Sequence, residues 1–317
     1  MFIKKDTRKV PEILTDENDE RKQLLLARRG NEFKNQSASL LFQEKYFSSF
    51  KNLQVLSLYG NKLNDLAGIA SALKDSPLTD LNLGRNEFTD LPEELSQLKT
   101  IKNVWIDDNK LTLIPNCIYD MDNLENLRLS GNQITVIDDK VQNLLQLETF
   151  VIDGNKLTNL PDALTKLANL KILNVRGNLL KSIPKKINAM SSLESLHISS
   201  NQIKNLPSNF DGMEFFKELY AGSNEIENVP SSLALLESIT FISLVNNNIS
   251  ELNEIVYQQW FDQENSKPKE FIHLKGNKVI RGSRSLSQQT PSPYFSANGK
   301  TITESAKKKK RRENNHQ

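Results

Sequence analysis

Few residues in this sequence have the types and spacing that catalysis or metal binding needs. The three histidines, His197, His273 and His316, lie far apart along the 317 residues, and Cys117 is the one cysteine. A zinc site needs several such ligands close together, and a reactive thiol needs an exposed, electropositive setting. The phosphate-binding loop, the H-E-x-x-H helix, paired C-x-x-C and the G-x-S-x-G elbow are all missing from the sequence. We therefore expect no catalytic residue, no metal ligand, no cofactor, and an inert, partly buried Cys117.

Asparagine is the polar residue that recurs at a fixed spacing. The first step is 25 residues, the later steps up to Asn247 are 23, and a step of 30 leads to the last copy. Apolar residues lie eight, five and three positions before each asparagine up to Asn247, and Ile272 and Leu274 lie five and three positions before Asn277. Residues two apart point to the same side of a strand, so each copy predicts a short strand with one buried edge. Because an amide both donates and accepts hydrogen bonds, we expect a buried structural ladder of Asn61, Asn86, Asn109, Asn132, Asn155, Asn178, Asn201, Asn224, Asn247 and Asn277.

Proline occupies a second column of the repeat. An apolar residue followed by proline recurs at Leu91-Pro92, Ile114-Pro115, Leu160-Pro161, Ile183-Pro184, Leu206-Pro207 and Val229-Pro230. Proline has no N–H donor and a fixed φ, which indicates a 3₁₀ or extended return segment and argues against long amphipathic helices. One such unit cannot bury its apolar edge alone, so neighbouring units must stack. The sequence predicts a curved solenoid with a parallel sheet on its concave side.

The unit L-x-x-L-x-L-x-x-N-x-L-x-x-L-P-x-x-L-x-x-L, over about residues 53–280, resembles the intracellular leucine-rich repeats of Ras-associated and Scribble/Erbin-type scaffolds. The resemblance implies an α/β leucine-rich-repeat solenoid that binds other proteins, with a small GTPase or a protein phosphatase as partner by analogy. The same repeat occurs in scaffolds, receptors and regulatory subunits, so the fold by itself does not choose among these functions.

The ends of the chain differ from the repeats in composition. Residues 1–52 contain apolar clusters at helix-like spacing, and we predict a helical N-terminal cap, with a partner-binding helix pair as the alternative. Residues 53–282 form the predicted solenoid of about ten repeats. Within it, the stretch 252–270 breaks the period and predicts a helix lined by Leu252, Ile255, Val256, Trp260 and Phe261.

Residues 283–317 are rich in polar and basic residues, and we expect a disordered tail. The tail ends in the basic run Lys307, Lys308, Lys309, Lys310, Arg311 and Arg312. Three interpretations stay open for this run: a nuclear localisation signal, contact with nucleic acid or anionic lipid, and simple solvated charge.

Charge and cysteine content constrain the setting of the protein. The formal net charge of +2 is too small for the whole molecule to act as an electrostatic nucleic-acid binder. One cysteine excludes an internal disulfide, and no stretch has the length and apolarity of a membrane span. We expect a monomeric protein of the cytoplasm, with the nucleus as the alternative.

Strand alternation predicts which side chains form the concave face. They include a tryptophan, a tyrosine and arginines, the residue types that dominate binding energy at protein interfaces. The predicted partner-binding residues are Trp105, Asp107, Asp108, Arg128, Asp153, Arg176, His197, Tyr220 and Phe241. The sequence favours a non-catalytic scaffold or adaptor in signalling. A regulatory or targeting subunit of an enzyme, and a nuclear factor directed by the basic tail, are the alternatives.

Overall fold

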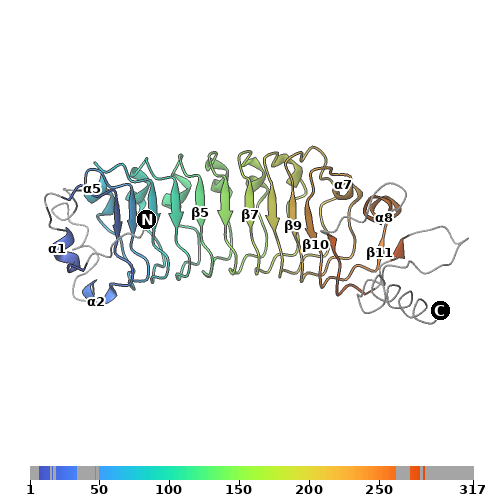
Figure 1. The fold of residues 1–317 in the computed structure, drawn as a ribbon, viewed down its shortest axis with the longest axis horizontal. Coiled ribbons are helices and arrows are strands. Elements are labelled where there is room, and N and C mark those ends of the chain that lie inside the picture. Colours follow the sequence, from blue (N-terminus) through green and yellow to red (C-terminus); the bar gives the residue numbers. More distant parts are fainter. Residues whose placement is uncertain are drawn as a thin grey trace, which may run out of the picture. The chain divides into compact units, whose positions relative to one another are not determined.

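The computed structural model describes residues 7–14, 16, 19–33, 47, 50–261, 272–278 and 281–282. The chain divides into two compact units, the first made of Met1–Leu157 and Pro161–Asn174, the second of Thr158–Leu160 and Val175–Gln317. Each unit has its own run of parallel strands and its own return segments (Figure 1). The repeat pattern does not predict this division, because the 23-residue period continues through it.

The strands of the first unit lie side by side in chain order, and every described neighbouring pair is parallel. Residues one repeat apart face each other, so that Asn82, Trp105 and Arg128 are partners on successive strands. The strands are β1 (Gln23–Leu25), β2 (Val55–Ser57), β3 (Asp80–Asn82), β4 (Asn103–Trp105), β5 (Asn126–Arg128), β6 (Thr149–Val151) and β7 (Ile172–Asn174).

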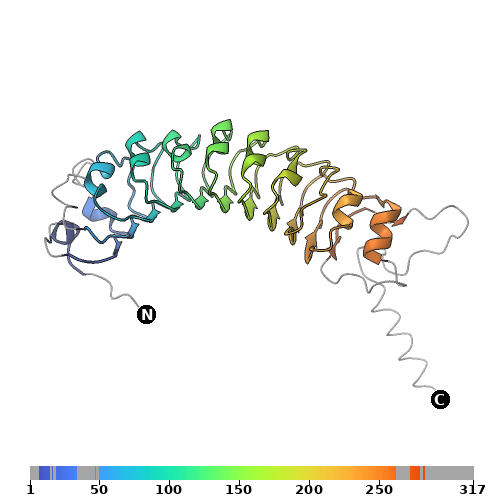
Figure 2. The same ribbon diagram turned by 90° about the horizontal axis from the view of Figure 1, so that it is seen from above.

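Short helices carry the chain back from one strand of the first unit to the next. Figure 2 shows these return segments on one side of the unit and the strands on the other. Three of them begin directly after a proline of the repeat, at Pro92, Pro115 and Pro161, and this proline is extended, with φ −68° and ψ 140° at Pro92. The helices of this unit are α1 (Val10–Leu14), α2 (Gly30–Phe33), α5 (Ile69–Leu73), η1 (Glu93–Gln97), α6 (Asn116–Tyr119), η2 (Asp139–Asn143) and η3 (Asp162–Lys166). The predicted 3₁₀ return path is confirmed at η1, η2 and η3.

The second unit repeats this arrangement. Its parallel neighbours are β8 with β9, β9 with β10, and β10 with β12. A separate pair, β11 with β13, is also parallel. The elements are η4 (Ile187–Ala189), β8 (Ser195–His197), β9 (Glu218–Tyr220), α7 (Ser231–Ala234), β10 (Phe241–Ser243), β11 (Glu251–Leu252), α8 (Glu254–Phe261), β12 (Ile272–His273) and β13 (Arg281–Gly282).

The core of each unit runs between its strands and its return segments. The middle residue of each strand points into it, and Leu81, Val104, Leu127 and Phe150 are 0% exposed. The first and third residues of each strand point the other way, as alternation requires. We call the surface formed by these first and third residues, and by the loop residues that follow each strand, the sheet face.

The repeated asparagines bond neighbouring coils to one another. In the first unit, Asn132 Nδ2 donates to the carbonyls of Ile106, 2.9 Å away in the preceding coil, and of Leu129, 3.0 Å away in its own coil. Its Oδ1 accepts from Leu111 N–H at 3.1 Å. Asn224 makes the same contacts in the second unit, with Ile198, Ala221 and Ile203. Buried backbone groups need hydrogen-bond partners. By supplying them, these amides fix the position and orientation of each coil relative to the preceding coil of its unit.

The predicted helical cap over 1–52 also contains a strand. Leu24 and Leu26 are buried at alternating positions, so Gln23–Leu25 extends the sheet as β1 in place of the helix that the leucine cluster suggested. Arg29 then occupies the asparagine position of this first coil. Its N–H donates to Asn61 Oδ1 at 2.6 Å, and its guanidinium bonds Glu32 Oε1 at 2.8 Å and the carbonyl of Arg8. An arginine thus ends the ladder and fixes α1 and α2 against the first coil.

The proline column is interrupted at Asp138, and the structure explains why. The Asp138 N–H donates to the Tyr119 hydroxyl at 3.2 Å, a bond that proline could not make. The Asp138 carboxylate also accepts from Lys140 N–H at 2.8 Å and so caps η2. Tyr119 is buried, and burial raises the pKa of its phenol to about 12.

Helix α8 covers the last coils of the second unit. Leu252, Val256 and Trp260 are buried, which supports packing as the role of this tryptophan. Ile255 is 45% exposed, so its predicted place on the buried side is wrong. It lies one residue before Val256, and adjacent helix positions point about 100° apart. The basic run from Lys307 to Arg312 lies outside the described residues.

Removing one ladder amide should destabilise the fold. In Asn132→Ala the two carbonyls keep the amides of Asn109 and Asn155 as partners, but the buried Leu111 N–H loses its acceptor. We expect a loss of about 2 kcal/mol in unfolding free energy, measured by urea denaturation. Asn123→Ala is the matched control, because the Asn123 amide bonds the Lys99 carbonyl at 2.9 Å on an exposed surface. Equal effects of the two substitutions would contradict a structural ladder.

Candidate protein-binding face

Trp105 lies on the sheet face of the first unit. It is the third residue of β4, between Asn82 on β3 and Arg128 on β5, and it is partly exposed. Among the described residues its indole N–H has no hydrogen-bond partner. A partly exposed tryptophan with an unused donor contributes little to the fold and is a strong anchor for a partner.

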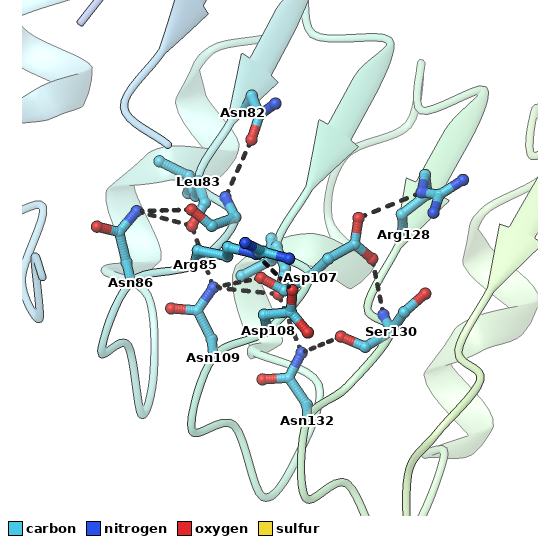
Figure 3. Close-up of polar contacts among 12 residues, drawn as sticks. Asn82, Leu83, Arg85, Asn86, Asp107, Asp108, Asn109, Arg128, Ser130 and Asn132 are labelled. Carbon is cyan, nitrogen blue, oxygen red and sulfur yellow. Dashed lines mark hydrogen bonds and ion pairs between the residues drawn. The ribbon is translucent and has the colours of Figure 1, made fainter. Parts of the chain in front are cut away.

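A chain of polar contacts links Asp107 to Arg128 and Ser130 of the next coil (Figure 3). Arg128 Nε bonds Asp107 Oδ2 at 3.2 Å, and Asp107 Oδ1 accepts from Ser130 N–H at 2.8 Å. The Ser130 hydroxyl donates to Asp153 Oδ1 at 2.6 Å. Within the described ranges, Asp153 has no cation as partner, and the outer guanidinium nitrogens of Arg128 have no acceptor. Both groups are therefore available to a bound protein.

A second polar pair lies beside this chain. Arg85 Nε bonds Asp108 Oδ2 at 3.1 Å, and the Arg85 guanidinium carbon lies 5.7 Å from the centre of the Tyr59 ring. Both charged residues have positive φ, 53° at Arg85 and 55° at Asp108. The same position in the flanking coils is glycine, at Gly60 and Gly131. A left-handed conformation costs a side-chain-bearing residue about 1–2 kcal/mol, and an exposed ion pair returns about 1 kcal/mol or less. In other coils the same position carries a left-handed residue with a side chain, at Ser200, Ser223 and Asn246, so such a residue is ordinary there.

Charges along one edge of the sheet face neutralise one another. Residues that directly precede the strands pair across coils, with Lys102 Nζ 2.7 Å from Glu125 Oε1 and Lys171 Nζ 2.8 Å from Glu148 Oε2. Water and salt screen both pairs, so they add little to the stability of the fold. These self-paired charges contrast with the incompletely paired groups around Trp105, which makes the latter the better candidate site.

The second unit carries the other predicted residues. Arg176 is exposed in the loop that leads away from β7, while His197, Tyr220 and Phe241 lie on β8, β9 and β10. The His197 and Tyr220 rings stack at 4.3 Å, and the Tyr220 and Phe241 rings lie 4.8 Å apart. The sequence prediction thus falls into two groups, a charged one around Trp105 and an aromatic one around Tyr220.

Two contributors to these groups were not predicted. Ser130 connects Asp107 to Asp153, and Ser195 connects His197 Nε2, at 3.0 Å, to Glu218 Oε2, at 2.9 Å. Residue type alone does not mark a serine as part of a binding surface. Only its position in the strand columns could have indicated such a role. The serine at 195 is not an activated nucleophile, because it donates to a carboxylate and the histidine does not bridge the two groups.

The residues that the structure describes contain no group of three or more His, Cys, Asp or Glu side chains suited to a metal ion. The two described histidines of the second unit, His197 and His273, lie on β8 and β12, with the rings of Tyr220 and Phe241 between them. In the described part of the chain, no helix is long and apolar enough to cross a membrane.

Cys117 should be unreactive in the folded protein. It is buried, and burial, together with the nearby carboxylates of Glu93, Asp90 and Asp120, raises the pKa of its thiol from 9.0 to about 12. Because the thiolate is the nucleophile, raising the pH from neutral to about 10 should ionise an ordinary thiol and leave this one protonated. We expect no reaction with Ellman's reagent in buffer and a full equivalent after denaturation. Rapid labelling of the native protein would contradict this burial.

Asp108→Gly should leave the stability of the fold nearly unchanged. It removes the left-handed strain and the exposed ion pair together, so we expect unfolding free energy to change by less than about 1 kcal/mol in urea denaturation. Gly154→Ala is the control, since Gly154 has φ 64° and space for the added methyl group, with no atom nearer than 3.5 Å. This control should be destabilised by about 1 kcal/mol or more. A loss of over about 2 kcal/mol in Asp108→Gly would assign Asp108 a structural role.

Comparison with known proteins shows which of them share this architecture. The sequence model of the family described as leucine rich repeat matches residues 76–134, 122–180, 145–203 and 169–226. No curated protein matches the chain. The Leptospira interrogans leucine-rich-repeat protein LIC12759 is similar with a TM-score of 0.65 and 26% identity, covering 87% of this chain and 78% of that one.

Two plant receptors share the fold. The peptide hormone receptor RGFR1, in complex with RGF2, gives a TM-score of 0.60 at 22% identity, covering 75% of this chain and 38% of that one. The ectodomain of GASSHO1/SCHENGEN3 from Arabidopsis thaliana, in complex with CASPARIAN STRIP INTEGRITY FACTOR 2, gives 0.58 at 22% identity, covering 76% and 32%. The parallel strands, the buried asparagine ladder and these matches together identify the fold as a leucine-rich-repeat solenoid.

Proposed function

We propose that this protein is a non-catalytic scaffold or adaptor in signalling that holds partner proteins against its sheet face. The observation that carries the proposal is the surface around Trp105, where an aromatic anchor, a free indole N–H and incompletely paired charges lie together on adjacent strands. Aromatic and arginine side chains are the usual centres of binding energy at protein interfaces. Leucine-rich-repeat proteins in general mediate protein–protein interaction, and two of the similar structures are receptors in complex with a partner.

The sheet face is favoured over the return side for a physical reason. The return side of the first unit also exposes apolar residues, such as Leu113 and Leu145, both 56% exposed, but exposed apolar side chains are normal on a protein surface. On the sheet face, by contrast, hydrogen bonds and the rigid ladder hold Arg128, Asp107 and Asp153 in place. A partner that binds there loses little side-chain entropy, because the groups are already ordered.

A reducing compartment is part of the proposal. Cys117 is buried and has no second cysteine to pair with, so the fold uses no disulfide. The cytoplasm is the proposed location, with the nucleus as the alternative that the basic run from Lys307 to Arg312 would direct. We propose a monomer, with a small GTPase or a protein phosphatase as the partner by analogy.

Affinity capture from a native lysate, with mass spectrometry of bound proteins, tests the proposal. Trp105→Ala combined with Arg128→Ala should reduce capture of specific partners by about tenfold or more, because truncated hot-spot residues cost 2 kcal/mol or more. Leu145→Ala combined with Lys140→Ala is the matched control, since it removes an exposed apolar side chain and a cation from the return side of the same unit.

Unchanged capture by the Trp105/Arg128 variant, with its fold verified by thermal denaturation, would contradict the proposal. The composition of the captured fraction separates the two function classes. Several partners would support a scaffold or adaptor. One enzyme in stoichiometric amount would support the regulatory-subunit alternative.

A further inference from the structure

Charges of both signs follow one another along the sheet face of the first unit. The loop after β3 carries a cation, the loop after β4 two carboxylates, the end of β5 a cation and the loop after β6 a carboxylate. Arg85 Nε bonds Asp108 Oδ2 at 3.1 Å, and Arg128 Nε bonds Asp107 at 3.2 Å, so opposite charges of neighbouring coils fix one another (Figure 3). We call Arg85, Asp107, Asp108, Arg128 and Asp153 the charge row.

Two members of the charge row keep an open side. Arg128 is 45% exposed, and its guanidinium uses only the Nε donor, so the outer nitrogens can still bind a carboxylate. Asp153 Oδ1 accepts from the Ser130 hydroxyl at 2.6 Å, while its Oδ2 has no donor. Among the described residues no cation lies within ion-pair distance of Asp153. A ligand can therefore bind both groups without breaking an existing contact.

The balance of charges argues against a ligand of one sign. The charge row contains three carboxylates and two guanidinium groups, so it is nearly neutral. Charges along the neighbouring strand edge cancel, because Lys102 pairs with Glu125 and Lys171 pairs with Glu148. A polyanion such as a nucleic acid would meet the carboxylates, and a polycation would meet the arginines. The charge row therefore fits a ligand that carries both signs.

Trp105, Arg128 and Asp153 lie in that order on a diagonal across the sheet face. Trp105 pairs with Arg128, and Arg128 pairs with Val151 on β6. The pairing continues past β6, because Gly131 N–H donates to the Asp153 carbonyl at 2.9 Å. From Trp105 to Asp153 the diagonal covers two strand spacings and two residues, about 12 Å, a length that four residue steps of an extended chain reach.

The unused indole N–H of Trp105 favours an extended ligand over a helical one. The backbone carbonyls of a helix bond within the helix, whereas an extended segment leaves carbonyls free to accept from the indole. Alternate side chains of an extended segment also point to the same side, about 7 Å apart. Three alternate side chains can therefore reach the three residues of the diagonal together.

We infer that this diagonal binds an extended segment of a partner protein whose alternate residues are apolar, acidic and basic, in that order. The apolar side chain packs on Trp105, the acid binds the outer nitrogens of Arg128, and the base binds Asp153. This inference rests on the proposed function and names the chemistry of the partner. The order of the charges excludes segments of the same composition in another order, because they would place like charges together.

Short Gly-Ser peptides carrying phenylalanine, glutamate and lysine at alternate positions test the inference. The matched control peptide has the same composition in the order phenylalanine, lysine, glutamate. Each is titrated into the isotope-labelled full chain, and the indole N–H resonances are followed by proton–nitrogen correlation NMR. The chain has two tryptophans, and Trp260, 1% exposed, is the internal control. The Trp105 resonance is the one that is lost in Trp105→Phe.

The first peptide should shift the Trp105 resonance and leave that of Trp260 in place. The control peptide should bind about tenfold more weakly, and added salt should weaken the first peptide. Asp153→Asn keeps an acceptor for Ser130 and removes only the charge, so it should weaken the first peptide by about fivefold. A peptide with serine in place of lysine should not respond to this substitution. Asp139→Asn, an exposed carboxylate on η2, is the matched control variant.

Several outcomes would overturn the inference: no shift of the Trp105 resonance, equal binding of the control peptide, or an Asp153→Asn effect no larger than that of Asp139→Asn. Tighter binding of an all-lysine peptide, an all-glutamate peptide or an oligothymidine would overturn it too. These outcomes are separable from failure of the proposed function, because partner capture that depends on Trp105 and Arg128 would persist even if the order of charges had no effect.

Discussion

The hydrogen bonds of the buried asparagines are the constraint on which the rest of the structure depends. Each amide joins two carbonyls and one N–H of adjacent coils, as Asn132 does with Ile106, Leu129 and Leu111. Within each unit, this fixes the register of each coil relative to the preceding coil, so residues one repeat apart face each other on neighbouring strands. That register aligns the equivalent side chains of successive strands in columns on the sheet face. The Arg128–Asp107 ion pair and the His197–Tyr220 stack both exist because the columns are aligned.

The same register produces two surfaces of different chemistry, one in each unit. Around Trp105, two arginines and three carboxylates are only partly matched, and a tryptophan donor is unused. Around Tyr220, aromatic rings from neighbouring strands contact one another. Surfaces of the first kind recognise partners through charge and hydrogen bonding, which gives specificity and salt dependence. A protein with both kinds can bind two elements of one partner, or two partners.

Much of the fold could be predicted from the sequence, because the same residue pattern recurs in successive coils. The asparagine phase predicts the strands, and the proline phase predicts the 3₁₀ returns. The departures from the repeat were harder to predict. β1 was missed since its coil has Arg29 where an asparagine was expected, and the Asp138 interruption depends on Tyr119, a residue in the preceding coil. For the candidate sites, residue type indicated Trp105 and Tyr220, but the serines at 130 and 195 act only through position, which composition cannot show.

Site-specific photo-crosslinking in living cells tests the central claim most directly, because it reports which surface of the protein the partners touch. A benzophenone side chain would replace Trp105 or Tyr220 on the sheet face, and Leu145 or Phe215, 56% and 57% exposed, on other surfaces. The account predicts covalent partner adducts from the sheet-face positions and few from Leu145 or Phe215. Adducts that form mainly from Leu145 or Phe215 would show that partners bind elsewhere and would contradict the account.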